Sequence, residues 1–87
     1  MYSYKEQRKE IFTESGVSML LKMRDNINKK LDVAGAVCAG KAMENISGDT
    51  WVMLAILDYL IEINELVEVT QEMECRGQDK IFTRKCL

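Results

Sequence analysis

The chain has 87 residues, 47% of them hydrophobic, which is enough for one domain (residues 1–87) with a modest core. A net charge of −2 neither indicates nor excludes a nucleic-acid-binding protein. Three cysteines without a Cys-x-x-Cys pair, and no histidine, argue against a zinc site or a disulfide framework and favour reduced thiols. We expect a cytoplasmic protein, because no signal peptide is visible and the longest apolar run, Trp51 to Leu57, is too short to span a bilayer.

The N-terminal segment, residues 1–14, is predicted to be an extension or a short amphipathic helix. Tyr4, Arg8, Ile11 and Phe12 follow helical spacing. They surround a block of charges that alternate in sign, which is typical of a solvated helix face.

A long helix follows, for which Thr13 or Ser15 is the predicted N-cap and Gly35 the predicted end. One face of this helix is apolar at spacings of three and four residues. Its members are Val17, Leu20, Met23, Ile27, Leu31 and Ala34.

Two short elements are expected next. Residues 36–40 are small and apolar and predict a brief strand or an extended link, with Cys38 as a buried packing residue. Residues 41–46 have room for one short helix that ends at a tight turn. Together with the helix that follows, this arrangement is typical of a helix-turn-helix unit.

The stretch from Ser47 to Asn64 predicts the second long helix. Ser47 is the expected N-cap, and Asp49 adds negative charge at the positive end of the helix dipole. Asn64 tolerates the left-handed conformation that ends many helices. From Glu65 the pattern changes to alternation, which indicates a strand.

The C-terminal segment, residues 66–85, is predicted to be a β-hairpin. Its strands lie at residues 66–69 and 81–83, and a polar loop containing Gly77 joins them. Cys75 lies near the loop tip and Cys86 at the far end, so a disulfide between them is not expected. The predicted fold is therefore mainly α with a C-terminal β-hairpin.

This order of elements, and the run from Ala55 to Val69, resembles the winged helix-turn-helix superfamily, whose third-helix signature reads "aLdyLvelGeIvev". Asn64 stands where glycine is usual. The resemblance covers residues 15–85 and implies a three-helix core plus a hairpin wing, to which residues 1–14 would add an extension or a short extra helix. It also implies DNA binding, with the third helix in the major groove and the wing on phosphates.

The residues expected to face DNA do not suit base recognition. Thr50, Trp51, Leu54, Ala55 and Asp58 offer an indole, aliphatic groups and a carboxylate instead of the usual donors. Residues 41–72 hold one lysine against seven acidic residues, a net charge of −6, which disfavours approach to phosphates. The wing is more basic, which is typical either of a solvated surface or of phosphate contacts. Its candidate nucleic-acid-binding residues are Arg76, Lys80, Arg84 and Lys85.

Trp51 is a candidate anchor for a protein partner, because tryptophan is enriched in interface hot spots. An alternative is that the segment around Tyr2 and Tyr4, or a second copy of the chain, covers it. The predicted partner-binding residues are Trp51, Leu54, Ala55, Asp58 and Glu62.

Three functions remain open from the sequence. The first is a non-enzymatic winged-helix regulatory or adaptor module that contacts a protein or itself, as a homodimer, through the acidic helix bearing Trp51. The second is a DNA-binding regulator that contacts the backbone through its wing, and the third is a small inhibitor of a nucleic-acid-binding machine. No catalytic residues, cofactor, metal or small-molecule substrate is expected, since histidine and a Gly-rich phosphate loop are both missing. No membrane association is expected either.

Overall fold

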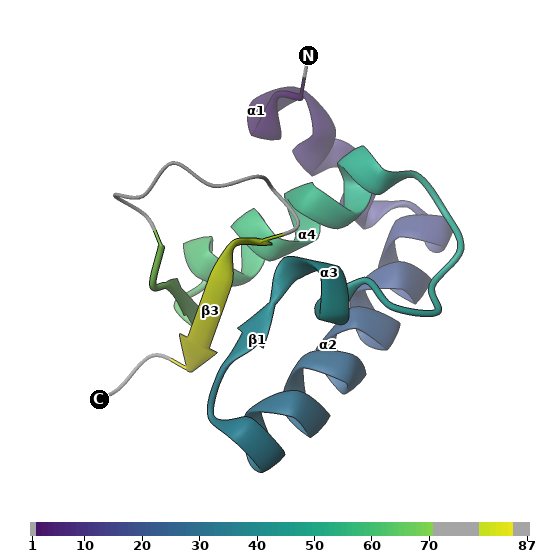
Figure 1. The fold of residues 1–87 in the computed structure, drawn as a ribbon. Coiled ribbons are helices and arrows are strands. Elements are labelled where there is room, and N and C mark those ends of the chain that lie inside the picture. Colours follow the sequence, from purple (N-terminus) through teal and green to yellow (C-terminus); the bar gives the residue numbers. More distant parts are fainter. Residues whose placement is uncertain (1, 71–78, 85–87) are drawn as a thin grey trace.

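The computed structural model describes residues 2–70 and 79–84 (Figure 1). The described chain is mostly helical with a small three-stranded antiparallel sheet, which confirms the predicted combination of a mainly α fold and a C-terminal β-hairpin. The elements in order are α1 (Tyr4–Gln7), the 3-10 helix η1 (Arg8–Phe12), α2 (Glu14–Ala34), β1 (Val37–Cys38), α3 (Ala39–Ala42), α4 (Thr50–Glu62), β2 (Leu66–Glu68) and β3 (Ile81–Arg84).

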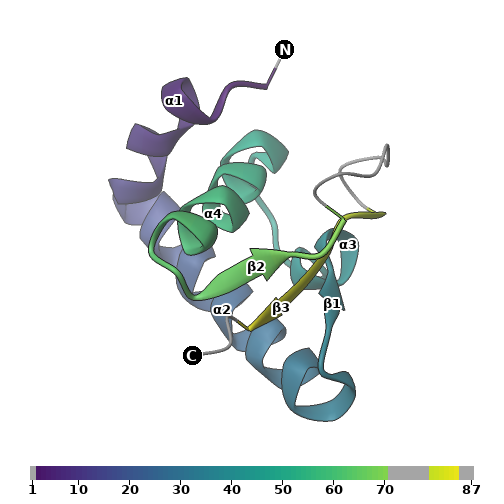
Figure 2. The ribbon, with the colours of Figure 1, turned by 90° about the vertical axis from the view of Figure 1, so that its left-hand side faces the viewer.

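The sheet has the order β1-β3-β2 (Figure 2). The strand β1, which precedes α3, therefore pairs with the hairpin strand β3 and forms the third strand of the sheet. Val37 in β1 lies opposite Phe82 in β3, and Val67 in β2 lies opposite Thr83. Phe82 and Val37 are buried, whereas Val67 and Ile81 are exposed. The inner face of the sheet therefore belongs to the core, and the outer face is an exposed apolar surface.

Helix α2 begins and ends as its sequence predicts. The Thr13 hydroxyl accepts a hydrogen bond of 3.0 Å from the Gly16 amide, which selects Thr13 over Ser15 as the N-cap. Gly35 ends the helix at a φ of 75°, in the left-handed region.

The buried face of α2 differs from the prediction at both ends. Val17 is 41% exposed and Ala34 is also exposed, while Gly16 and Met19 are buried instead. At the start of the helix the reason is tertiary, because η1 packs against the first turn of α2 and draws a different side of the helix inward. In the middle of the helix the predicted Met23, Ile27 and Leu31 are all buried.

The N-cap of α4 is Asp49 and not Ser47, which corrects the prediction. The Asp49 carboxylate accepts a hydrogen bond of 2.8 Å from the Trp51 amide. Ser47 is too early because Gly48 has a φ of 148°, which no right-handed helix contains. At the other end Asn64 has a φ of 64°, the left-handed conformation expected there.

The helix α3 starts earlier and is shorter than the predicted segment 41–46. The side-chain amide of Asn26 donates to the carbonyl oxygens of Ala42, at 3.1 Å, and Glu44, at 2.9 Å. These bonds satisfy carbonyls that the end of a helix leaves without partners. Cys38 is only partly buried, because it lies opposite Ile81 on the outer face of the sheet.

The core joins all these elements. Its largest fully buried side chains are Phe82, Ile11, Met23, Ile56 and Leu60. Ile11 comes from η1, so the N-terminal segment is folded against the domain as α1 and η1. Each such side chain contributes about 1.5–3 kcal/mol by leaving water.

Candidate interaction site

The predicted partner surface on α4 is only partly present. Ala55 has no exposed surface, so the prediction that its side chain faces outward is wrong. The physical reason is that α1 and η1 both contact α4, on a side that a core of three helices alone would leave in solvent. Figure 1 shows α1 lying above α4 at the N-terminal end of the chain.

Two of the predicted residues are occupied by the N-terminal arm, which we define as residues 2–12. The Tyr2 hydroxyl donates to Asp58 Oδ2 at 2.6 Å. The Tyr4 hydroxyl donates to Glu62 Oε1 at 3.0 Å. Arg8 donates to the same carboxylate from Nε at 3.1 Å and from Nη2 at 2.7 Å, in a bidentate ion pair. Glu62 is thus paired with a cation within the chain, whereas Asp58 keeps its charge and accepts a hydrogen bond from a neutral phenol.

An aromatic cluster lies beside these polar contacts. The rings of Phe12 and Tyr59 meet edge to face, with centroids 5.4 Å apart and an interplanar angle of 87°. The Arg8 guanidinium lies 5.3 Å from the centroid of Phe12 and 5.6 Å from that of Tyr59. The sequence shows no signal for this cluster, because the alternating charges of the arm are equally typical of a solvated helix.

The protonation states agree with these contacts. Burial and the hydrogen bond to Asp58 raise the pKa of Tyr2 above its usual range. Burial and the bond to Glu62 likewise raise the pKa of Tyr4. The bonds from Arg8 and Tyr4 lower the pKa of Glu62. At neutral pH the phenols therefore remain donors and the carboxylate remains a charged acceptor.

Trp51 remains accessible at the first turn of α4. Its side chain is 42% exposed, and Leu54 is half-buried. The hydroxyls of Tyr2 and Tyr4 instead bind Asp58 and Glu62, about two and about three turns farther along α4. The alternative that this segment buries Trp51 is therefore wrong, since the side chain stays exposed. Cover by a second copy stays a prediction.

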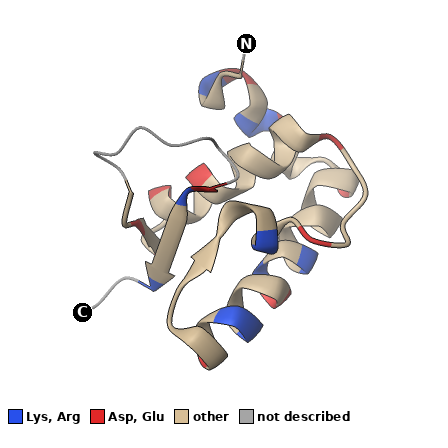
Figure 3. Cartoon of the chain, viewed as in Figure 1, with Lys and Arg blue, Asp and Glu red and all other residues tan. Residues whose placement is uncertain are grey.

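Two of the basic candidates in the C-terminal segment, Lys80 and Arg84, have acidic neighbours. Arg84 Nη2 lies 2.9 Å from Asp32 Oδ1 of α2. Lys80 Nζ lies 3.9 Å from Glu68 Oε1. Figure 3 shows basic residues at both ends of β3 and further ones along α2. Arg76 and Lys85 lie outside the described residues.

A third surface, which the sequence analysis missed, is the outer face of the sheet. Val67 is 40%, Val69 58% and Ile81 38% exposed. The signal was present in the alternation of the strands, since every second residue there must point away from the core.

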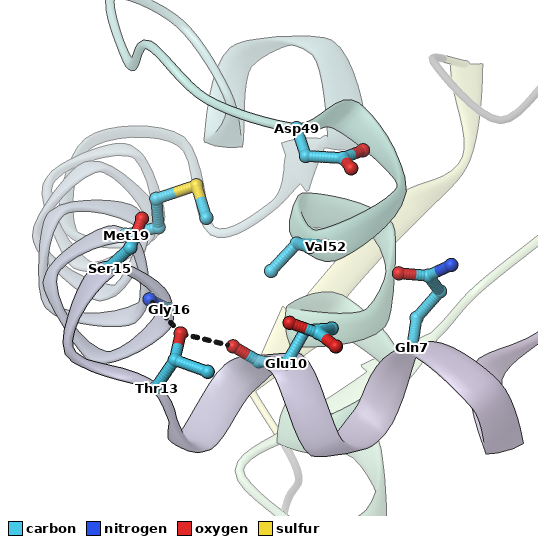
Figure 4. A pocket seen from close by; sticks show the side chains of 8 residues that line it. All are labelled: Gln7, Glu10, Thr13, Ser15, Gly16, Met19, Asp49 and Val52. Atoms are coloured by element: carbon cyan, nitrogen blue, oxygen red, sulfur yellow. Dashed lines mark hydrogen bonds between the residues drawn. The ribbon is translucent and has the colours of Figure 1, made fainter.

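A cavity of about 390 Å³ lies where the first turns of α2 and α4 approach η1 (Figure 4). Two of its polar side chains are already engaged in the fold, since Thr13 and Asp49 cap the two helices. The Thr13 hydroxyl also donates to the backbone oxygen of Glu10 at 2.8 Å. Among residues 2–70 and 79–84, no group of three or more histidine, cysteine, aspartate or glutamate side chains could hold a metal ion.

Comparison of the chain with protein-family models found no match, and searches of curated proteins and of solved structures found none either. Across the described helices, none combines the length and apolar character needed to cross a membrane.

Proposed function

We propose that the chain is a non-enzymatic winged-helix module that acts through protein contacts. The fold supports this in the order of its elements: a long helix, a short strand, a short helix, a turn, a second long helix and a hairpin. That order is the one on which the resemblance to the superfamily rests. The pairing of β1 with β3 adds support, because it joins the strand that precedes α3 to the C-terminal hairpin.

The observation that carries the protein-contact function is the exposure of Trp51. A tryptophan that leaves 42% of its surface in water can gain a large apolar area by binding a partner. Leu54 follows it by three residues and so lies on the same side of α4. We place the contact surface at these two residues, and not at Ala55, which is buried.

The two alternatives have weaker support. DNA binding through the wing would compete with the ion pairs that Arg84 makes with Asp32 and Lys80 with Glu68. Imitation of nucleic acid would need outward-facing carboxylates, but Asp58 accepts a hydrogen bond from the arm. Both alternatives are outcomes of the experiment that follows.

The experiment uses Trp51 as both the probe and the target, since it is the single tryptophan of the chain. We expect its fluorescence emission to shift to the blue when a partner or a second copy binds. We expect Trp51→Ala to weaken that binding, measured by sedimentation, by at least about tenfold, which corresponds to 1.4 kcal/mol. Leu21→Ala is the matched control, because Leu21 is 60% exposed on a different helix.

Equal binding by Trp51→Ala and the wild type, with both folded, would refute the proposal. Salt-sensitive binding to mixed duplex DNA would favour the DNA alternative instead, provided that Lys80→Glu and Arg84→Glu abolish it. Capture of a DNA- or RNA-binding protein through intact Asp58 and Glu62 would favour the inhibitor.

A further inference from the structure

The N-terminal arm has two parts that are held in different ways. Its second part is anchored, since Ile11 is fully buried and the η1 backbone lies against Gly16 of α2. Its first part is held less firmly, because α1 has four residues, none of them fully buried, and its N-cap Ser3 makes no side-chain capping hydrogen bond. Tyr2 and Tyr4 pack against the core but are only partly buried. A helix of this length has almost no stability of its own.

The first part is held mainly by side chains that reach α4. We call residues 2–8 the strap, because Tyr2, Tyr4 and Arg8 bind Asp58 and Glu62 across the surface. The ion pair is exposed, with 43% of the Arg8 side chain and 41% of the Glu62 side chain accessible. Exposed pairs contribute little to stability and are screened by salt. The strap can therefore open locally while Ile11 keeps η1 in place.

Opening of the strap would change the chemistry of α4. The helix Thr50–Glu62 contains two carboxylates and no lysine or arginine. Release of the strap would remove the Tyr2 donor from Asp58 and the Tyr4 and Arg8 donors from Glu62. Trp51 and Asp58 are two helical turns apart on the same side, so the uncovered acidic patch would extend the surface around Trp51.

We propose that the strap is an autoinhibitory segment, which occupies in cis a site on α4 for a cationic polypeptide. The contacts of the strap indicate which groups that partner carries. It would present an arginine to Glu62 and phenolic hydroxyls to Asp58 and Glu62. This inference rests on the proposed function, in that it makes α4 the contact helix. It adds a second, regulated site next to Trp51.

Competition with the strap predicts a specific dependence of affinity on the arm. A tethered segment acts at a high effective concentration, so a free peptide binds weakly while the strap is intact. Weakening the strap without touching the carboxylates raises the fraction of molecules with an open site, and the apparent affinity rises with it.

The probe is a synthetic peptide with the sequence of residues 2–9, titrated into the isotope-labelled full chain and followed by NMR. We compare the wild type with the variant Tyr2→Phe/Tyr4→Phe/Arg8→Gln, which keeps both carboxylates. We expect the variant to bind at least about tenfold more tightly, with shifts at Asp58 and Glu62. Arg24→Gln is the matched control, since its ion pair with Glu65 is also exposed but lies outside the strap.

Two results would overturn the inference. One is an affinity in the strap variant no higher than in the wild type. The other is unchanged binding when Asp58→Asn and Glu62→Gln are added to that variant. Amide hydrogen exchange supplies a second measurement, in which the Gln7 amide, bonded to the Ser3 carbonyl, must exchange faster in the strap variant while α2 is unaffected. If Trp51→Ala does not weaken partner binding, the proposed function is refuted but the autoinhibitory strap is not. The peptide titration does not depend on Trp51.

Discussion

The substitution Gly16→Ala tests the packing of the N-terminal arm, because it reverses the usual effect of this change. In a helix interior, replacing glycine by alanine stabilises by about 1 kcal/mol. Gly16 lies in the first turn of α2 with the η1 backbone directly beside it. A Cβ there would lie 2.6 Å from the Ile11 carbonyl oxygen, and closer still to that of Glu10, whereas Cβ atoms essentially never approach another heavy atom within 3.0 Å.

The close contact involves backbone atoms, so no side-chain rotation can relieve it. Relief requires η1 to move away from α2, and η1 carries the fully buried Ile11. Backbone shifts forced by overpacking cost about 1–3 kcal/mol, and complete loss of the Ile11 side chain would cost about 2–5 kcal/mol. After subtracting the helix-propensity gain we expect a net loss of about 2 kcal/mol.

Urea denaturation followed by circular dichroism and by Trp51 fluorescence measures this loss as a lower transition midpoint. Hydrogen exchange should also show weaker protection of amides in η1. Ser18→Ala is the control on the same helix, because Ser18 is exposed and its change should stay within about 0.5 kcal/mol. A Gly16→Ala variant as stable as the wild type, or more stable, would refute the packing of η1 against α2.

Three further predictions follow from single contacts. Asp49→Ala should lower the free energy of unfolding by about 1 kcal/mol, because it removes the N-cap of α4. Ser47→Ala should leave that free energy unchanged in the same urea titration, and the opposite ranking would identify Ser47 as the cap. Phe82→Ala should cost about 3–5 kcal/mol, since Phe82 is 2% exposed between β1 and β2, and a loss under 1 kcal/mol would contradict its place in the core. The pKa of Glu62 is lowered by Arg8, so the stabilisation that this pair gives is complete above the unfolded pKa of about 4.3 and is lost as pH falls through the lower folded pKa. NMR titration should find that pKa raised towards its usual value in Arg8→Gln, and an unchanged pKa would count against the pair.

The arm also changes how the charge of the protein is understood. From the sequence alone, Asp58 and Glu62 predict that α4 is an acidic helix whose charges bind an external partner. In the structure the first partner of both carboxylates is the chain itself. Under the proposed opening of the strap both carboxylates lose these donors, so the charge that α4 presents depends on the position of the arm.

The sequence by itself determined the features that depend on neighbours within one or two turns. Thr13, one of the two predicted caps, begins α2, and Gly35 ends it as predicted. Asn64 takes the expected left-handed conformation after α4, although the cap at the start of that helix is Asp49 and not Ser47. The change of period at Glu65 correctly predicted the strand β2. Capping, handedness and periodicity are local, because the atoms involved are close in the chain.

Only the tertiary structure decided which faces are buried and which charges are free. The packing of η1 rotated the buried face at the start of α2, and α1 and η1 together closed the side of α4 on which Ala55 lies. The bond between Tyr2 and Asp58 joins residues 56 positions apart. No local pattern encodes such a pair, because the burial and the partner of a side chain depend on how distant segments pack together.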